Sequence, residues 1–194
     1  MRPQVLLLAS SSPRRSQLLA SHRIPFEVIV PIASEITDPE LAPEALVLRN
    51  AQIKARDVSA RHPDHIVLAA DTVVAFGGRI FGKPRDMAEA AWMLEQLSGC
   101  EHQVFSGVCL RRETEPREES FVETTRVRFK ALTPEQRRAY LERIQPLDKA
   151  GAYAAQDDRG EIIESIMGSI SNVVGLPMEA LQRALGAWGI TAEF

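Results

Sequence analysis

One carboxylate interrupts the most apolar stretch of this sequence. Asp71 lies inside the run from Ile66 to Phe76, whose other members are mainly valine and alanine. A buried carboxylate without a partner is costly, so such a residue usually pairs with a cation, binds a metal or takes part in catalysis. The structural alternative is a strand-end Asp that caps a turn. Thr72 comes next, and alternation along a strand would direct its hydroxyl to the opposite side.

A second candidate group combines hydroxyls with arginines. The segment Ser10-Ser11-Ser12-Pro13-Arg14-Arg15 follows an apolar run and begins an expected helix. Free backbone N–H groups, the positive helix end and two guanidinium groups form a favourable anion site. A cation at this end opposes the helix dipole, a conflict that a bound phosphate would remove. The alternative is a serine-capped helix with solvated arginines.

Two lysines and one glutamate become candidates only beside these groups. Lys83 follows a glycine, which permits close approach of a ligand, and a hairpin brings it toward Asp71. Lys54 shares a helix face with Asn50, four residues earlier; alone, it would be a surface lysine. Glu35 lies in a polar loop and by itself indicates only a solvated side chain.

Composition and charge exclude several classes of protein. The chain has 194 residues, of which 45% are apolar, enough for one domain with a core. With 23 basic and 26 acidic residues the net charge is -3, which provides no general field for nucleic-acid binding. Neither a P-loop nor a dinucleotide fingerprint is present. The four histidines, and the cysteines Cys100 and Cys109, show no metal-ligand spacing.

The apolar run near the N-terminus, residues 5–9, is short. It is too short for the hydrophobic region of a signal peptide and far too short to span a bilayer. We therefore expect a cytoplasmic protein that does not associate with membranes.

Strands and helices alternate in a pattern typical of an α/β domain. The expected strands span residues 5–9, 26–30, 66–76, 79–81, 104–110, 121–129 and 161–166. The expected helices begin at residue 13 and span residues 43–60, 87–97, 134–143 and 177–185. Because hairpins occur among interleaved helices, a mixed sheet is expected.

Local signals predict several of the boundaries. Gly77-Gly78 suits a two-residue hairpin turn, and Asp86 and Thr133 each begin a capping-box pattern. The charged segment 111–119 is expected to be a solvated loop at a hairpin tip. Gly186 is expected to end the last helix.

Together these segments resemble the Maf family of nucleoside triphosphate pyrophosphatases. The matching segments follow the family order and cover almost the whole chain: 9–15, 18–19, 54–55, 70–74, 82–86, 97–99, 148–153 with Gln156, and 174–177. The resemblance implies one domain over residues 1–194. It also implies a fold similar to inosine-triphosphate pyrophosphatases, with a long curved mixed sheet flanked by helices and a central cleft between two lobes.

The resemblance further implies cleavage between the α- and β-phosphates with Mg²⁺ or Mn²⁺, commonly by a homodimer. By position, Asp71 matches the catalytic proton acceptor, and Glu35 and Asp71 match acids of a metal site. The remaining matches are phosphate contacts at Ser10, Arg15, Lys54 and Lys83, and specificity positions at Arg14, Thr72 and Gln156.

The segment around Gln156 resembles the family branch that acts on dTTP and UTP, as does Tyr153. A glutamine amide both donates and accepts, which suits the O4 and N3–H edge of uracil or thymine; flipped, it suits cytosine, so CTP stays open. The sequence departs from the family at Asp157 and Asp158, where glycine usually follows the glutamine.

Removal of non-standard or excess nucleotides is the role expected for such an activity. The alternatives are the same reaction on 7-methyl-GTP, a non-catalytic nucleotide-binding regulator of cell division, and a general phosphatase.

Overall fold

A computed structural model describes residues 5–38, 40–156 and 158–190. At its centre is a seven-stranded mixed sheet of order β2-β1-β3-β5-β6-β7, in which β4 also pairs with β3. β1 is parallel to β2 and β3, and the other neighbours are antiparallel. The strands are β1 Leu6–Ala9, β2 Phe26–Val28, β3 Val67–Phe76, β4 Arg79–Phe81, β5 Glu101–Arg112, β6 Arg117–Phe129 and β7 Ile163–Met167.

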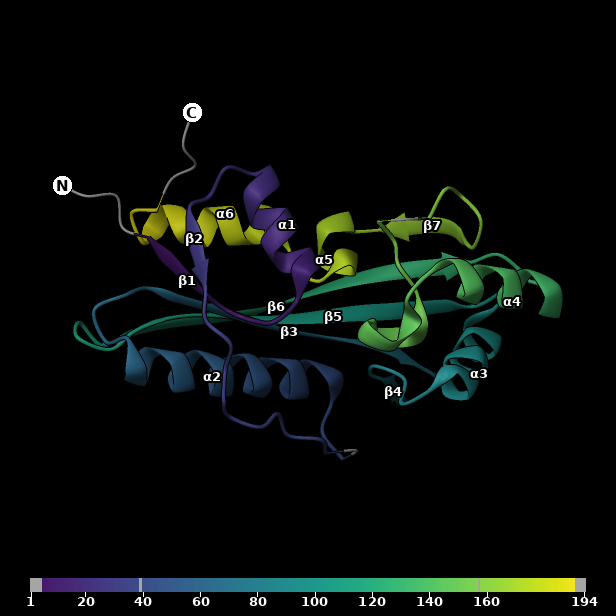
Figure 1. Cartoon of the computed structure of the whole chain (residues 1–194), viewed down its shortest axis with the longest axis horizontal. Coiled ribbons are helices and arrows are strands. Elements are labelled where there is room, and N and C mark those ends of the chain that lie inside the picture. The colour runs from purple at the N-terminus through teal and green to yellow at the C-terminus, as the bar shows by residue number, and fades with distance from the viewer. Residues whose placement is uncertain (1–4, 39, 157, 191–194) are drawn as a thin grey trace.

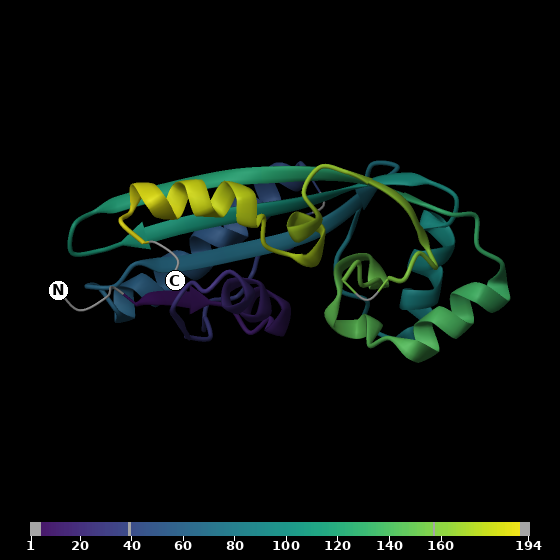
Figure 2. The same ribbon diagram turned by 90° about the horizontal axis from the view of Figure 1, so that it is seen from above.

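Helices cover both faces of the sheet and gather in two lobes. The helices are α1 Pro13–Ser21, α2 Pro43–Arg61, α3 Met87–Leu97, α4 Pro134–Arg143, α5 Ile170–Val174 and α6 Met178–Ala187, with short 3-10 helices η1 Pro146–Asp148 and η2 Ala150–Ala152. Figure 1 shows α1 and α6 on one face and α2 on the other. Figure 2 shows β3, β5 and β6 curving along the molecule, with α6 (yellow) toward one end and α3 and α4 at the other. The expected two-lobed α/β architecture is confirmed.

The apolar run in β3 is buried on both sides. Leu68 and Ala70 pack into the cluster beneath α1 and α6, whereas Val67 and Ala69 pack toward α2. Alternate side chains therefore face two different helical layers, which is why the strand reads as a continuous apolar run. A further cluster, which includes Val74, fills the lobe of α3 and α4.

The predicted turn and caps are confirmed in two places and half formed in a third. Gly77 and Gly78 both have positive φ, as a two-residue hairpin turn requires. Thr133 forms the complete capping box of α4. Asp86 accepts a hydrogen bond from the Glu89 N–H, but the Glu89 carboxylate bonds the N–H of Arg85, outside the box pattern.

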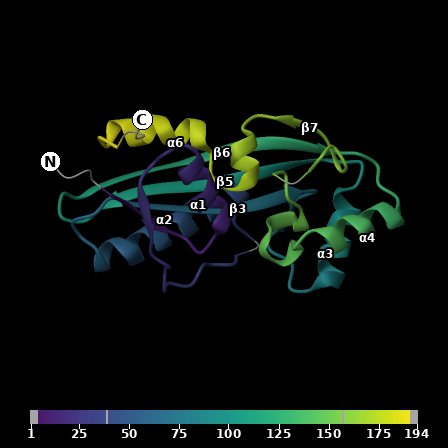
Figure 3. The ribbon, with the colours of Figure 1, turned by 45° about the horizontal axis from the view of Figure 1, so that its top comes forward.

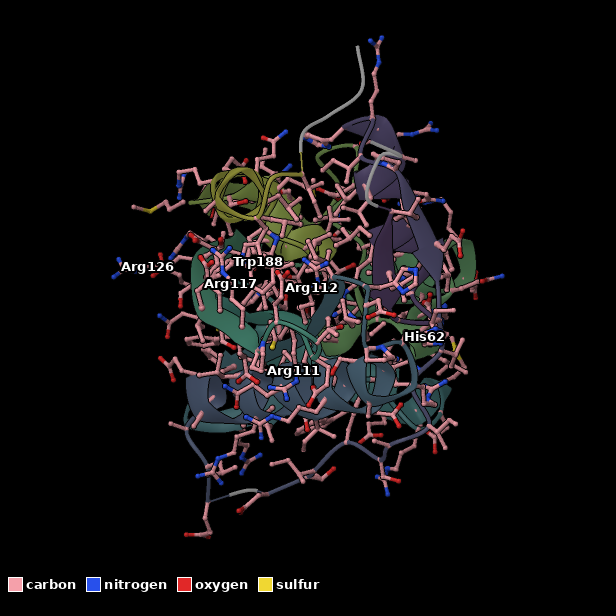
Figure 4. The ribbon with its side chains drawn as sticks, turned by 90° about the vertical axis from the view of Figure 1, so that its left-hand side faces the viewer. His62, Arg111, Arg112, Arg117, Arg126 and Trp188 are labelled. Carbon is pink, nitrogen blue, oxygen red and sulfur yellow. The ribbon has the colours of Figure 1, made fainter. Side chains whose placement is uncertain are left out.

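Other local predictions were wrong. The charged segment 111–119 forms the tip of the β5–β6 hairpin, as expected, but the loop covers only residues 113–116, because cross-strand pairs such as Arg111–Glu118 hold the strands together on either side. Figure 4 looks onto this end of the hairpin, where Arg111, Arg112 and Arg117 are labelled. α6 runs through Gly186 to Ala187, and the five-residue helix α5 was not expected.

In the part of the chain that the structure describes, every helix is too short or too polar to cross a bilayer.

Candidate active site

A cleft of about 1140 Å³ lies between the lobes, beside an open stretch of β3. Along the edge of β3 that faces away from β5, β1 pairs only with residues 67–69 and β4 only with residues 74–76. The edge between these two partners is therefore unpaired, and Asp71, Thr72 and Val73 from it line the cleft. The other predicted site residues also line it, apart from Gln156.

Asp71 lies in the cleft wall and has a partner on each carboxylate oxygen. It is 8% exposed. Its Oδ1 accepts a hydrogen bond from Lys54 Nζ at 2.8 Å, and its Oδ2 accepts one from Asn50 Nδ2 at 3.1 Å. Both partners project from α2, so one turn of this helix satisfies the buried charge. The structural alternative, an Asp that caps a strand end, is wrong.

Lys54 lies at the centre of three oxygen atoms. Its ammonium is 2.6 Å from Glu35 Oε1 and 2.8 Å from Asp71 Oδ1, and it donates to the Ala70 carbonyl oxygen at 3.1 Å. Only 6% of the residue is exposed. Lys54 is therefore a buried cation of the site, and its alternative as a surface lysine is wrong. The Glu35 side chain is 53% exposed, so this acid approaches from the mouth of the cleft.

Asn50 is a site residue to which sequence reasoning assigned no role. Besides Asp71, it binds the backbone of Ile36: Oδ1 accepts from the N–H at 2.8 Å, and Nδ2 donates to the carbonyl oxygen at 3.2 Å. These bonds hold Ile36, the neighbour of Glu35, against Asn50. They therefore keep the carboxylates of Glu35 and Asp71 near each other. The available signal was the spacing of Asn50 and Lys54, which are four residues apart on α2 and so share one face of the helix.

Arg15 turns into the protein, away from the solvated position of the structural alternative. It is 9% exposed. Nε donates to the Gly175 carbonyl oxygen at 2.8 Å, Nη1 to Ser10 Oγ at 3.2 Å and Nη2 to Thr72 Oγ1 at 3.0 Å. Figure 3 shows α1, which carries Arg15, beside α5, which precedes Gly175. Among the described residues, no carboxylate forms an ion pair with this guanidinium.

Burial disfavours the charged form of the Arg15 guanidinium. Desolvation is the main influence and lowers the pKa of the guanidinium, while the charges of Asp71 and Glu35 act in the opposite direction. Because all three acceptors of Arg15 are neutral, its positive charge stays available to attract an anion in the cleft.

Ser10 and Thr72 support Arg15 from two sides. Ser10 Oγ also accepts the Ser12 N–H at 3.1 Å, whereas the side chain of Ser12 forms no cap. Thr72 Oγ1 lies 2.9 Å from Ser106 Oγ. As strand alternation predicted, Asp71 meets α2 while Thr72 meets residues on the opposite face of the sheet.

Arg14 spans the cleft. Its Nη1 lies 2.7 Å from Asp148 Oδ2, and its Nη2 donates to the Asp148 carbonyl oxygen at 2.8 Å. Lys149 Nζ pairs with the other carboxylate oxygen at 2.7 Å. Burial opposes ionisation of Asp148, but the hydrogen bonds from Lys149 and Arg14 outweigh it and lower its pKa. Sequence reasoning included Asp148 and Lys149 only in the family-like segment 148–153 and assigned neither a role.

The remaining predicted residues are less well placed. Lys83 lines the cleft on an exposed loop and, among the described residues, has no hydrogen bond or ion pair. Gln156 is exposed and lies outside the described lining of the cleft. Asp157 lies outside the described residues. The Asp158 carboxylate accepts three backbone N–H groups, those of residues 161–163, and so organises the turn before β7.

The residues around Lys54 fit a divalent metal. Glu35 and Asp71 direct carboxylate oxygens to one point, and the Ala70 carbonyl oxygen points there too. Mg²⁺ and Mn²⁺ prefer such oxygen donors and commonly use one or two carboxylates together with substrate phosphates. Within the described residues, no group of three or more His, Cys, Asp or Glu side chains could hold a metal. A metal here would therefore depend partly on substrate oxygens.

Comparisons with known proteins place the sequence among named relatives. The family described as Maf-like protein matches residues 5–188. A protein named dTTP/UTP pyrophosphatase from Symbiobacterium thermophilum is 49% identical over 96% of this chain and 95% of its own length. Another with that name, from Halalkalibacterium halodurans, is 44% identical over 100% of both chains.

Among solved structures, the Ham1 protein of Staphylococcus aureus is similar in fold. It superposes with a TM-score of 0.55 at 14% sequence identity, covering 95% of this chain and 100% of that one. At this identity the likeness concerns the fold alone, and it agrees with the expected inosine-triphosphate pyrophosphatase-like architecture.

Proposed function

The chain belongs to the Maf family, and from this membership we propose that it hydrolyses pyrimidine nucleoside triphosphates, dTTP and UTP, to the monophosphate and pyrophosphate. The observation that carries the proposal is the position of Asp71, a paired carboxylate in a cleft wall that also bears the buried guanidinium of Arg15. The names of the relatives support the substrate class.

The cations of the cleft suit a triphosphate. Arg14, Arg15, Lys54 and Lys83 come from distant parts of the chain and line one cavity. Cleavage of a phosphoanhydride needs charge neutralisation and a positioned water more than covalent help from the protein. These side chains would bind the phosphate oxygens and draw negative charge away from the bond that breaks.

Asp71 would act on the attacking water. Its carboxylate oxygens can accept a hydrogen bond from water and orient it or take up its proton. Asn50 and Lys54 hold the carboxylate so that its geometry is set before substrate arrives. Mg²⁺ or Mn²⁺, held by Asp71 and Glu35, would neutralise charge on the phosphate oxygens.

Base recognition is assigned to Arg14, Thr72 and Gln156 on the family pattern. The amide of Gln156 would read the O4 and N3–H edge of the pyrimidine. Because Gln156 lies outside the described cleft lining, its part in recognition stays a prediction. The homodimer and the cytoplasmic location are likewise predictions.

A nucleotide panel tests the reaction and its specificity. The protein is incubated with dTTP, UTP, CTP or 7-methyl-GTP and with Mg²⁺ or Mn²⁺, and the products are separated. We expect monophosphate and pyrophosphate from dTTP and UTP. Release of orthophosphate would contradict the reaction, and turnover of p-nitrophenyl phosphate would favour a general phosphatase.

The alternatives are less well supported. A non-catalytic regulator of cell division shares the anion site but needs no carboxylate like Asp71, and the relatives described above carry the name dTTP/UTP pyrophosphatase, which favours dTTP and UTP over 7-methyl-GTP. If the protein hydrolysed only 7-methyl-GTP in the panel, this nucleotide would replace dTTP and UTP as the proposed substrate.

A further inference from the structure

The ammonium of Lys54 lies where oxygen atoms of two acids and one backbone carbonyl converge. We propose that Lys54 occupies the position of the divalent metal in the nucleotide-free protein, so that the ammonium and the metal exclude each other there until a nucleotide offers Lys54 new partners. The inference rests on the proposed function, because it assumes a metal-assisted reaction in this cleft.

The geometry resembles a cation cage. Three oxygens lie 2.6, 2.8 and 3.1 Å from Lys54 Nζ, contributed by Glu35, Asp71 and Ala70. Two are carboxylate oxygens and one is a carbonyl oxygen, the ligand types that Mg²⁺ and Mn²⁺ take from proteins. Metal–oxygen bonds are about 2.0–2.1 Å for Mg²⁺, so the same oxygens would serve after a small inward movement.

The charges make the two occupants competitors. With Lys54 in place, two carboxylates and one ammonium leave a net charge of -1 in the cage. A metal ion arriving beside the ammonium would meet a like charge at short range in a partly buried site. A nucleotide would relieve the conflict, because its phosphate oxygens can receive the long and flexible lysine side chain.

The cage can remain assembled when Lys54 leaves it. Asn50 binds Asp71 Oδ2 and both backbone polar groups of Ile36, the neighbour of Glu35. These bonds do not involve Lys54, so they keep the two acids close. Glu35 is the acid whose side chain is half exposed, which leaves a path for the incoming metal. Metal and nucleotide are therefore expected to bind together.

Manganese binding without nucleotide tests this inference. Free Mn²⁺ is measured by electron paramagnetic resonance during titration of the wild type, Lys54→Met and Lys149→Met. Lys149→Met is the matched control, since it also removes one positive charge from the cleft but does not touch the cage. We expect Lys54→Met to bind Mn²⁺ at least about tenfold more tightly than either of the others.

A second variant guards against loss of the fold. Lys54→Gln keeps a polar, hydrogen-bonding side chain without the positive charge, and circular dichroism establishes that each variant is folded. Adding Glu35→Gln to the tighter-binding variant should abolish its gain in affinity. Equal Mn²⁺ affinity in the wild type and in the folded Lys54 variants would overturn the inference.

The outcome is separate from that of the proposed function. A protein that releases pyrophosphate, but whose Lys54 variants bind Mn²⁺ no better, keeps the function and loses the inference. A protein whose Lys54 variants gain Mn²⁺ affinity as expected, but that releases no pyrophosphate, shows that Lys54 excludes the metal and contradicts the proposed function.

Discussion

Single side chains connect the fold to the chemistry at Arg15 and Asp71. Arg15 gives its hydrogen bonds to neutral oxygens, so its charge can act on a phosphate. Asp71 has a partner on each oxygen, so its carboxylate is held in one orientation. Arg15 contacts one face of the sheet, and Asp71 projects from the other face toward α2. Both nevertheless line the cleft beside the unpaired edge of β3.

His102 provides a residue-scale prediction about stability. It is 2% exposed, and burial lowers its pKa from 6.5 to about 4. In the unfolded chain the imidazole is therefore protonated below about pH 6.5, whereas in the folded protein it stays neutral down to about pH 4. The free energy of unfolding should fall by up to about 3 kcal/mol from this residue between those two pH values.

Urea unfolding at pH 7 and pH 4.5 measures this effect. The wild type should lose more stability between the two pH values than His102→Gln, which lacks the titration but can still hydrogen-bond Tyr153. Equal losses in the two proteins would show that His102 is not the group responsible.

At this scale, the sequence predicted the residues whose type conflicts with their surroundings. Asp71 stood out because it is a charge within an apolar strand. Asn50 and Asp148 did not stand out, because their importance depends on what they touch across 21 and 134 residues of sequence, respectively. The inward turn of Arg15 depends on Gly175, which no local pattern brings near α1.

Among the elements, the packing of α2 on β5 positions the Asp71 carboxylate. A Cβ at Gly107, the residue opposite Asp71 on β5, would overlap the backbone of Val47 and Leu48. Gly107 thus allows α2 to approach closely enough for Asn50 and Lys54 to reach Asp71.

Gly107→Ala should lower the free energy of unfolding by at least about 2 kcal/mol, because the helix must move or the core must be strained. Thermal and urea unfolding measure the loss. Gly186→Ala is the matched control, since a Cβ there meets nothing within 4 Å and α6 gains a better helix former. A Gly107→Ala protein as stable as the control would contradict the close packing.

The order and type of most elements could be predicted from periodicity and caps. The ends of β5 and β6 could not, because alternating charges look solvated in sequence but form cross-strand pairs in the sheet. α5 was missed because five residues are too few to show a helical period. Gly186 did not end its helix, since glycine in a helix costs only about 1 kcal/mol and the helix C-cap lies at Trp188.

At the scale of the whole molecule, Arg14 and Asp148 join the two lobes across the cleft. Arg14 lies on α1 and Asp148 on η1, and their side chains are 20% and 48% exposed. Such an exposed pair contributes little to global stability. Its effect should instead appear in how the two lobes hold a substrate between them.

Asp148→Asn should raise KM for dTTP or UTP by about three- to tenfold and change the melting temperature little, because the exposed pair adds at most about 1 kcal/mol. Glu164→Gln is the control: it breaks the exposed Arg128–Glu164 pair between β6 and β7 and should leave KM unchanged. Steady-state kinetics and thermal melting report the two quantities. The same KM shift in both variants would remove any special role of the bridge.

The two-lobed shape came from the resemblance, and not from the periodicity of the chain. The predicted two-residue turn and the strand over residues 79–81 show where β4 stops along β3, but no sequence pattern shows which residues of β3 pair with β1, and this decides which residues face the cleft. The convergence of the site is therefore a property of the sheet edge, and could be predicted only as a family expectation.

The most direct measurement compares turnover and binding in Asp71→Asn, with Asp64→Asn on an exposed turn as control. Pyrophosphate release from UTP or dTTP gives kcat, and calorimetry with a non-hydrolysable α,β-imido analogue gives affinity. Asp71→Asn should lower kcat by a factor of about 10² or more while affinity for the analogue stays within a few-fold of the wild type. Wild-type turnover in Asp71→Asn would contradict the account.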